Sequence, residues 1–188
     1  MAPQTKVSKE EIIETAYELA RDEGIDAVTA KAIAKRLGCS IQPVYWVFDT
    51  MENLRSAVTV RANEEYNKYS LAEVPGLPKF KAVGWNYIRF AKNCPNLFKL
   101  LFMSERYKDT SALVAPIDDN RDYMITAVKE NYGITDDAVA NRIYVELWLF
   151  SHGLATMIVT KTVNISDREI GEMLTDVMMG VLKNYKSK

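Results

Sequence analysis

Residues 29–48 read TAKAIAKRLGCSIQPVYWVF, two short helical patterns joined by a tight turn at Gly38. Thr29 is suited to cap the first helix, whose apolar positions recur at helical spacing. Ser40 is suited to cap the second helix, and Pro43 falls in its first turn, where a missing N–H costs little. This is the layout of a helix-turn-helix, whose second helix enters the major groove of DNA. A helical hairpin with a basic face is also common in helical bundles, so the spacing alone leaves both interpretations open.

The charge of this window differs from that of the whole chain. The 188 residues contain 24 Lys+Arg and 25 Asp+Glu, a net charge of -1 with a pI near 6.0. That total excludes a protein that coats nucleic acid by bulk positive charge. Residues 29–48 nevertheless hold Lys31, Lys35 and Arg36 and no acid, a local +3 that favours phosphate contacts.

The composition of the chain, its few helix-breaking residues and its helix-capping motifs predict an all-α fold. Only 8 Gly and 6 Pro interrupt the chain, and 48% of it is apolar. Capping boxes at Ser8 and Ser166, each with a Glu three residues later, open an early and a last helix. The breaker Pro75-Gly76-Leu77-Pro78 marks a boundary. We expect a three-helix DNA-binding domain over 1–50, a connecting fourth helix over 51–74, and a helical effector-binding and dimerisation domain over 75–188.

Several classes of function find no support in the sequence. No nucleophile elbow, zinc-protease helix, P-loop or dinucleotide fingerprint occurs, so we expect no enzyme and no cofactor. Cys39 and Cys94 form neither a disulfide framework nor a metal motif. The apolar run 143–159 is too short for a membrane span and contains Glu146 and His152. The first residues lack a signal peptide, so we expect a cytoplasmic protein.

Residues 8–54 resemble the N-terminal domain of the TetR family of bacterial transcriptional regulators. The resemblance rests on Gly38-Cys39-Ser40, Val44-Tyr45, Phe48 and Glu52-Asn53-Leu54. It implies that Thr29 and Tyr45 contact phosphate and that Gln42, Pro43 and Trp46 face the groove. With the basic window, the candidate DNA-binding residues are Thr29, Lys31, Ser40, Gln42, Pro43, Tyr45 and Trp46.

The chain departs from the family pattern at four positions. The family usually has small residues at positions 42 and 43, a His or Arg at 46, and a Lys at 51, where this chain has Gln42, Pro43, Trp46 and Met51. Gln42 is able to pair with adenine, and Pro43 or Trp46 with a thymine methyl group. Alternatively, Trp46 merely covers the domain surface.

The C-terminal part resembles the effector domain of TetR regulators named for a Trp-His-Gly signature. The similar residues are Tyr87 to Ala91, Asn93, Pro95, Leu97-Phe98, Leu101-Phe102, and later Trp148 with His152-Gly153. Small-molecule sites are mostly apolar with a few polar groups. The candidate effector-binding residues are therefore Trp85, Phe90, Phe98, Phe102, Tyr107, Tyr123, Tyr144, Trp148 and His152. An aromatic stripe at helical spacing is also typical of a plain core, and His152 of a hydrogen-bonded buried histidine.

The helix over 143–159 is apolar nearly all round and needs partners on more than one side. The family pairs its last two helices with those of a second subunit, so we expect a homodimer that binds a palindrome. The candidate interface residues are Gly153, Met157, Ile170, Leu174, Val177 and Val181. The alternative is a monomer with a well-buried final helix.

We therefore expect a repressor that a small-molecule effector releases from double-stranded DNA. The alternative is a helical small-molecule binding or interaction protein with weak or lost DNA binding. Residues 79–108 carry seven basic residues against Glu105, which would favour an anionic effector or simply form a solvated face.

Overall fold

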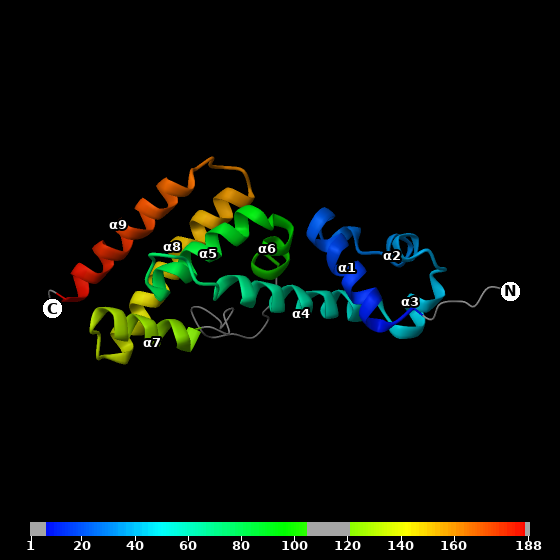
Figure 1. Ribbon diagram of the computed structural model, residues 1–188, viewed down its shortest axis with the longest axis horizontal. Coiled ribbons are helices and arrows are strands. Elements are labelled where there is room, and N and C mark those ends of the chain that lie inside the picture. The colour runs from blue at the N-terminus through cyan, green and yellow to red at the C-terminus, as the bar shows by residue number, and fades with distance from the viewer. Residues whose placement is uncertain (1–6, 105–120, 187–188) are drawn as a thin grey trace. The chain divides into compact units, whose positions relative to one another are not determined.

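The computed structural model describes residues 7–104 and 121–186, and within these ranges every regular element is a helix (Figure 1). Their bounds are α1 Lys9–Glu23, a 3-10 turn Ile25–Ala27, α2 Ala30–Leu37, α3 Gln42–Val47, α4 Met51–Ser70, α5 Lys79–Asn93, α6 Pro95–Phe102, α7 Arg121–Tyr132, α8 Asp137–Val159 and α9 Asp167–Lys186. The expected all-α class is confirmed. In the described ranges, no helix is both long and apolar enough to cross a membrane.

The chain divides into two compact units. Among the described residues, unit 1 comprises 7–65 and Cys94–Ser104, and unit 2 comprises Tyr66–Asn93 and 121–186. The chain passes between them inside α4 and again between α5 and α6. This differs from the expected boundary at 75–78, which is a turn within unit 2 that joins α4 to α5.

Unit 1 is organised by α1, which packs against α2 and α6. The Ser8 capping box begins α1 as predicted: Ser8 Oγ accepts from the Glu11 N–H at 3.1 Å, and Glu11 accepts from the Ser8 N–H at 2.7 Å. Near the end of α1, the Asn96 side-chain amide donates to the carbonyl oxygens of Arg21 and Asp22, each at 3.1 Å. These carbonyls lie in the last turn of a helix, where they lack helical partners. Asn96 thereby attaches α6 to unit 1.

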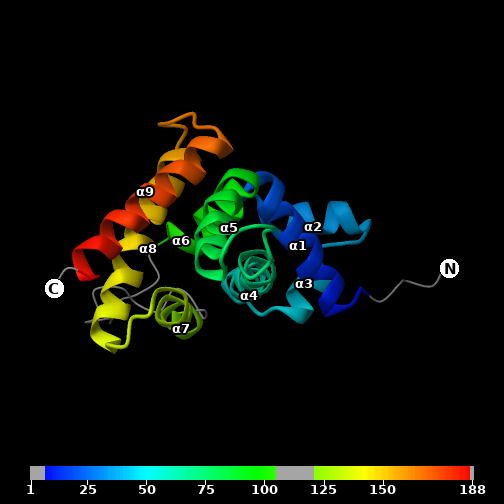
Figure 2. The same ribbon diagram turned by 60° about the vertical axis from the view of Figure 1, so that its left-hand side comes forward.

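Unit 2 is built around α5 and α8, which share an extensive contact. α9 lies beside α8 in both ribbon views (Figures 1 and 2), and α7 packs against α5 and α8. Buried Asn86 donates to the carbonyl oxygens of Ser70 at 3.2 Å and Ala72 at 2.7 Å, which fixes the end of α4 on α5. The Ser166 capping box opens α9 as predicted. α8 is capped by Asp136, whose side chain accepts from the Ala138 and Val139 N–H groups.

Candidate nucleic-acid interface and ligand cavity

α3 presents a polar and aromatic face over a buried anchor. Val44 and Phe48 are buried in unit 1, whereas Gln42 is exposed and Pro43 is half-buried. Tyr45 and Trp46 have exposed fractions of 49% and 78%. The two rings are neighbours in the chain, so they form one exposed aromatic surface on this helix. Gln42, Tyr45 and Trp46, which are predicted to contact DNA, are therefore accessible, and Pro43 is partly accessible.

The two predicted caps of the helix pair behave differently. Thr29 Oγ1 accepts from the Ala32 N–H at 3.2 Å and caps α2, as predicted. A hydroxyl accepts with a lone pair, so its own proton remains able to donate to a phosphate. Ser40 was predicted to cap α3, but Ile41 occupies that position without a side-chain hydrogen bond. Pro43 removes one of the first-turn N–H groups that a cap would receive, and Ser40 stays exposed before the helix.

The turn between α2 and α3 depends on Gly38. This residue has φ 65° and ψ 29°, the left-handed conformation that ends many helices and that glycine adopts without strain. After α3, Thr50 caps α4 by accepting from the Asn53 N–H at 3.1 Å. α3 is thus held between two defined helix ends.

The local positive charge is smaller than the sequence indicated. Arg36 donates to Glu23 at 3.1 Å and also lies within 4.0 Å of Glu18 and Asp22. Lys31 and Lys35 are exposed and form no ion pair within the described residues. These two lysines are therefore the cations of the window that remain for phosphate, and Arg36 mainly holds α2 against α1.

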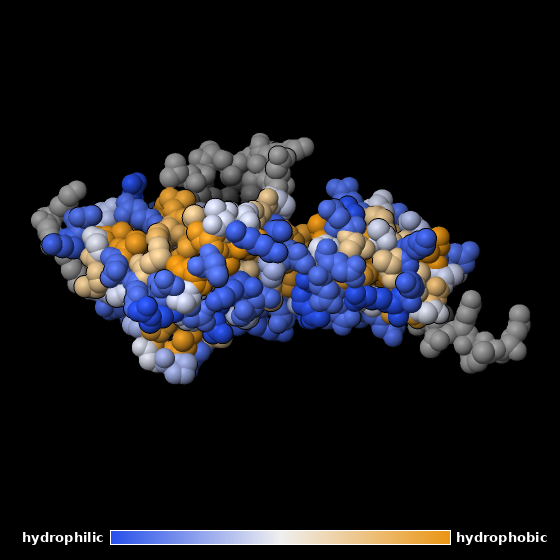
Figure 3. Space-filling model, turned by 90° about the horizontal axis from the view of Figure 1, so that it is seen from above, coloured by the Kyte–Doolittle hydropathy of each residue, from blue (hydrophilic) through white to orange (hydrophobic). Residues whose placement is uncertain are grey.

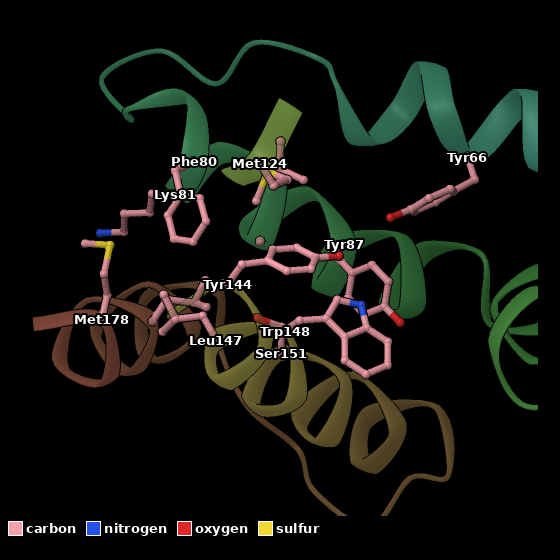
Figure 4. A pocket seen from close by; sticks show the side chains of 13 residues that line it. Tyr66, Phe80, Lys81, Tyr87, Met124, Tyr144, Leu147, Trp148, Ser151 and Met178 are labelled. Atoms are coloured by element: carbon pink, nitrogen blue, oxygen red, sulfur yellow. The ribbon is translucent and has the colours of Figure 1, made fainter. Parts of the chain in front are cut away.

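Unit 2 contains a small, partly open cavity of about 50 Å³ between α5, α8 and α9 (Figure 4). Tyr66 projects into it from α4. Phe80, Lys81 and Met178 lie at one end, and Tyr87 and Trp148 lie toward the other. The lining residues are Tyr66, Phe80, Lys81, Val83, Gly84, Tyr87, Met124, Tyr144, Leu147, Trp148, Ser151, Leu174 and Met178. A mostly apolar wall with a few polar groups is typical of a small-molecule site.

The small residues Gly84 and Ser151 keep part of this space open. A methyl group at Gly84 would lie 3.8 Å from Leu174 Cδ2 and 3.8 Å from Ser151 Oγ, an ordinary van der Waals separation. There is thus room at Gly84 that the chain leaves unfilled. In a well-packed core such space is rare.

His152 adjoins this cavity through two of its wall residues. Its Nδ1 lies 2.8 Å from the Tyr87 hydroxyl, and its ring stacks on Trp148 with centroids 5.0 Å apart and an interplanar angle of 11°. Burial lowers the pKa of His152 below its ordinary value of 6.5. The imidazole is therefore mainly neutral at pH 7, and the residue is a half-buried histidine with a hydrogen-bond partner. Within the described residues, no group of three or more His, Cys, Asp or Glu is placed to hold a metal ion.

Two protein-family models match this chain, one over the N-terminal part and one over the C-terminal part. The family described as "Bacterial regulatory proteins, tetR family" matches residues 12–58. The one described as "Tetracyclin repressor-like, C-terminal domain" matches residues 80–182, more than half of the chain. The chain belongs to the TetR family.

Curated relatives share parts of this TetR-family chain. An HTH-type transcriptional repressor of Mycobacterium tuberculosis is 35% identical over 60 residues, 32% of this chain and 23% of the relative. The class D tetracycline repressor protein of Escherichia coli is 27% identical over 104 residues, 55% of this chain and 43% of the relative. The chain thus spans less than half the length of these relatives. They are transcriptional regulators and not enzymes.

Solved structures share the fold along nearly the whole TetR-family chain. A tetR-family transcriptional regulator from Streptomyces coelicolor aligns with a TM-score of 0.70 and 18% identity, over 94% of this chain and 82% of the other. A TetR-like regulator from Rhodococcus sp. RHA1 aligns with a TM-score of 0.63 and 16% identity, over 95% and 97%. At these identities the likeness concerns the fold.

The structure brings together only some of the predicted effector-binding residues of this TetR-family chain. Tyr144 and Trp148 line the cavity, and His152 adjoins it. Phe90 lies behind the wall, with its ring centroid 5.3 Å from that of Tyr66. Trp85 packs against Gly171 of α9. Glycine has no side chain, and a Cβ atom at position 171 would lie only 3.3 Å from the Trp85 indole.

The remaining predicted effector-binding residues lie elsewhere. Phe98 and Phe102 belong to α6 and therefore to unit 1, because Asn96 attaches that helix to α1. They contact each other, with ring centroids 5.1 Å apart. Tyr123 on α7 is 42% exposed and is absent from the cavity wall. Tyr107 lies outside the described residues.

Sequence reasoning missed the polar part of the cavity wall. Lys81, Tyr66, Tyr87 and Ser151 are scattered over three helices, and no local motif joins them. One usable signal was the presence of small residues, half-buried Gly84 and buried Ser151, in otherwise bulky apolar helices. Such positions leave space unless a larger side chain crosses over to fill it.

The predicted interface residues of this TetR-family chain divide into two groups. Gly153 and Met157 on α8 are exposed, and Val177 and Val181 on α9 are half-buried. Ile170 and Leu174 are buried inside unit 2, Leu174 as part of the cavity wall, so the structure assigns them to the subunit core. The exposed apolar residues on these helices are Leu149, Met157, Met173 and Met179. Apolar groups also reach the surface in the space-filling view (Figure 3).

Proposed function

We propose that this chain is a DNA-binding transcriptional regulator, most simply a repressor that a small-molecule effector releases from a palindromic operator. The observation that carries the proposal is α3, which begins just after a defined turn and is anchored by buried Val44 and by buried Phe48 directly after it. Gln42, Tyr45 and Trp46 on this helix are exposed. A recognition helix needs this combination of a fixed backbone and accessible polar and aromatic groups. The family membership supports the same function.

The assignment of DNA contacts extends this proposal. Tyr45 and Thr29 donate their hydroxyl protons to phosphate, and Lys31 contributes charge near the start of α2. Gln42, Pro43 and Trp46 meet base edges, with Ser40 beside them. Phosphate contacts of this kind set register and affinity, whereas base contacts set sequence preference.

A homodimer fits the exposed helix faces. Leu149, Gly153 and Met157 recur every four residues along α8, and Met173, Val177 and Gly180 form a similar stripe on α9. A second copy of the chain would cover both stripes, and a two-fold arrangement gives two recognition helices for the two halves of a palindrome.

The effector site of this proposal is the cavity of unit 2. Tyr66, one of its wall residues, lies on α4, whose first part, from Met51 to Glu65, belongs to unit 1. A ligand that displaces Tyr66 therefore acts on a helix that both units share. Release from DNA requires that the effector bind more tightly to one arrangement of the units than to the other.

Three finer assignments belong to the same proposal. The C-terminal unit represents the Trp-His-Gly branch, which the stacked Trp148 and His152 with Gly153 support. The protein is not an enzyme, since its relatives are regulators. It acts in the cytoplasm, where its DNA is.

A second candidate function has one observation in its favour. Arg36 is held by acids of α1, and Met51 stands where the family favours a lysine, so few cations remain for phosphate. A helical small-molecule binding protein with weak DNA binding would have this charge pattern.

A gel shift against the DNA upstream of the protein's own gene separates the two functions. The regulator is expected to retard that DNA at low salt and to retain part of its binding when the salt concentration is raised fourfold. Because few phosphates are neutralised, the salt dependence should be shallow. No shift on this DNA, and no enrichment from a pool of random duplexes, would contradict the proposed function.

A further inference from the structure

The size of the cavity limits what it holds. The cavity volume of about 50 Å³ is the space open to the centres of water-sized probes. At roughly 12 Å³ for each probe, the cavity accommodates about four waters. Four waters occupy about 120 Å³ in the liquid. That is the scale of one six-membered aromatic ring with a small substituent. Walls of Tyr66, Tyr87, Tyr144 and Trp148 suit a planar ring.

The charge of the wall is equally selective. Among the lining residues that lie in 7–104 and 121–186, Lys81 is the charged residue and there is no carboxylate. Acids lie on the other side of Lys81, in an open surface groove that it shares with Glu172 and Asp176. Glu172 is paired with Arg168 at 2.7 Å. Within the described residues, Lys81 forms no ion pair with either acid.

The Lys81 ammonium is held in place at this edge of the cavity. It donates to Thr175 Oγ1 at 2.5 Å, and Thr175 in turn donates to the Gly171 carbonyl oxygen at 2.7 Å. An ammonium carries three N–H donors, so this arrangement engages one of them. A carboxylate entering the cavity would receive a charge-assisted hydrogen bond from a cation that is already oriented.

We infer that the cavity takes a small aromatic carboxylate, with its single ring among the tyrosines and Trp148 and its carboxylate at Lys81. The inference rests on the proposed effector site and adds the chemical class of its ligand. A cationic ligand is disfavoured because the described part of the cavity wall offers it a positive charge and no acid.

Three probes that share one ring test the charge preference: benzoate, benzamide and protonated benzylamine. Calorimetry on the full chain, without DNA, is expected to give the order benzoate, then benzamide, then benzylammonium. Thermal shift reports the same order through the mass-action gain in stability. Binding of benzylammonium as tight as that of benzoate, or no binding of benzoate at millimolar concentration, would overturn the inference.

Substitution of Lys81 tests the position of the carboxylate. Lys81→Met keeps the aliphatic stem and should weaken benzoate binding about 10- to 100-fold, as expected for a lost hydrogen bond between charged groups, while benzamide binding changes little. Lys92→Met is the matched control, since Lys92 lies on the same helix but pairs with Asp167 at 2.6 Å. Equal losses in both variants, or none in Lys81→Met, would contradict the assignment.

A third variant tests the position of the ring. Gly84→Ala places one methyl group in the open space without a clash and should raise the melting temperature, because alanine favours a helix interior. Benzoate binding should weaken in this stabilised protein. Unchanged binding would place the ring elsewhere. Because these measurements use no DNA, their failure is distinguishable from failure of the proposed DNA binding.

Discussion

At the scale of single residues, the ring of Tyr45 packs on α3, whereas its hydroxyl is the group proposed to contact DNA. The ring is half exposed beside buried Val44, so removing the oxygen leaves the packing of α3 intact. We expect Tyr45→Phe to weaken operator binding by about 10-fold or more, the typical effect of losing a hydrogen bond to a charged group. Fluorescence anisotropy at fixed salt measures the change. Tyr123→Phe, at a similarly exposed tyrosine of unit 2, should bind as wild type; equal losses in the two variants would remove Tyr45 from the contact surface.

His152 carries the clearest pH dependence. Its pKa in the folded protein is below 6.5, the value expected when unfolded, so the unfolded state binds more protons as pH falls through 6.5. Wild type should therefore lose stability between pH 7.5 and pH 5.5 more steeply than His152→Gln. Urea unfolding at the two pH values measures this difference. Parallel losses in the two proteins would show that His152 does not titrate on unfolding.

At the scale of elements, local signals in the sequence predicted most helices well. Capping by Ser8, Thr29, Thr50 and Ser166 depends on residues within one turn, so these helix starts could be read from the chain. The placement of α6 could not, because Asn96 bonds to carbonyls 74 and 75 residues away. For this reason the sequence did not show that Phe98 and Phe102 lie in unit 1, away from the cavity.

The cavity could be predicted only in part for a similar reason. Tyr144 and Trp148 lie one turn apart on α8, and both belong to the aromatic set that the sequence predicted. Lys81 and Tyr66 reach the same space from other helices, and only the packing of those helices brings them together. An aromatic stripe shows where a helix is buried but not whether the space opposite is filled.

The attachment of α6 gives a prediction for stability. Asn96→Ala removes two hydrogen bonds to the last turn of α1 and should destabilise the protein by about 1 to 2 kcal/mol, because water reaches the freed carbonyls. Asn184→Ala, at an exposed position of α9, is the control and should be near neutral. Thermal or urea unfolding measures both. A near-neutral effect of Asn96→Ala would mean that apolar contacts alone hold α6.

At the scale of the whole molecule, the proposed dimer is testable at residues outside the subunit core. Leu149 and Met157 are 49% and 41% exposed on one stripe of α8. Leu149→Glu with Met157→Glu should lower the mass seen in sedimentation while the helix content stays unchanged. Changing Leu174 would be less informative, because its side chain is buried in the subunit. Val60→Glu, on α4 with 61% exposure, is the matched control; a persisting dimer in the double variant would place the interface on another face.

The chain passes between the units inside α4, again between α5 and α6, and a third time after Ser104. α4 runs from Met51 just after α3 to Ser70, and Tyr66 near its end lines the cavity. A ligand that fills the cavity therefore contacts the same helix that follows the recognition helix in the chain. Ligand and DNA then each affect the binding of the other by the same factor.

The 78% exposure of Trp46 also makes the protein its own optical probe. The chain has three tryptophans, and Trp85 and Trp148 both belong to unit 2. An indole in water emits at longer wavelength than a buried one, so the red edge of the emission spectrum belongs mainly to α3. Operator binding should dim or blue-shift that edge, and a cavity ligand should quench the emission of Trp148. One unlabelled sample would thus report occupancy at both sites in a single titration.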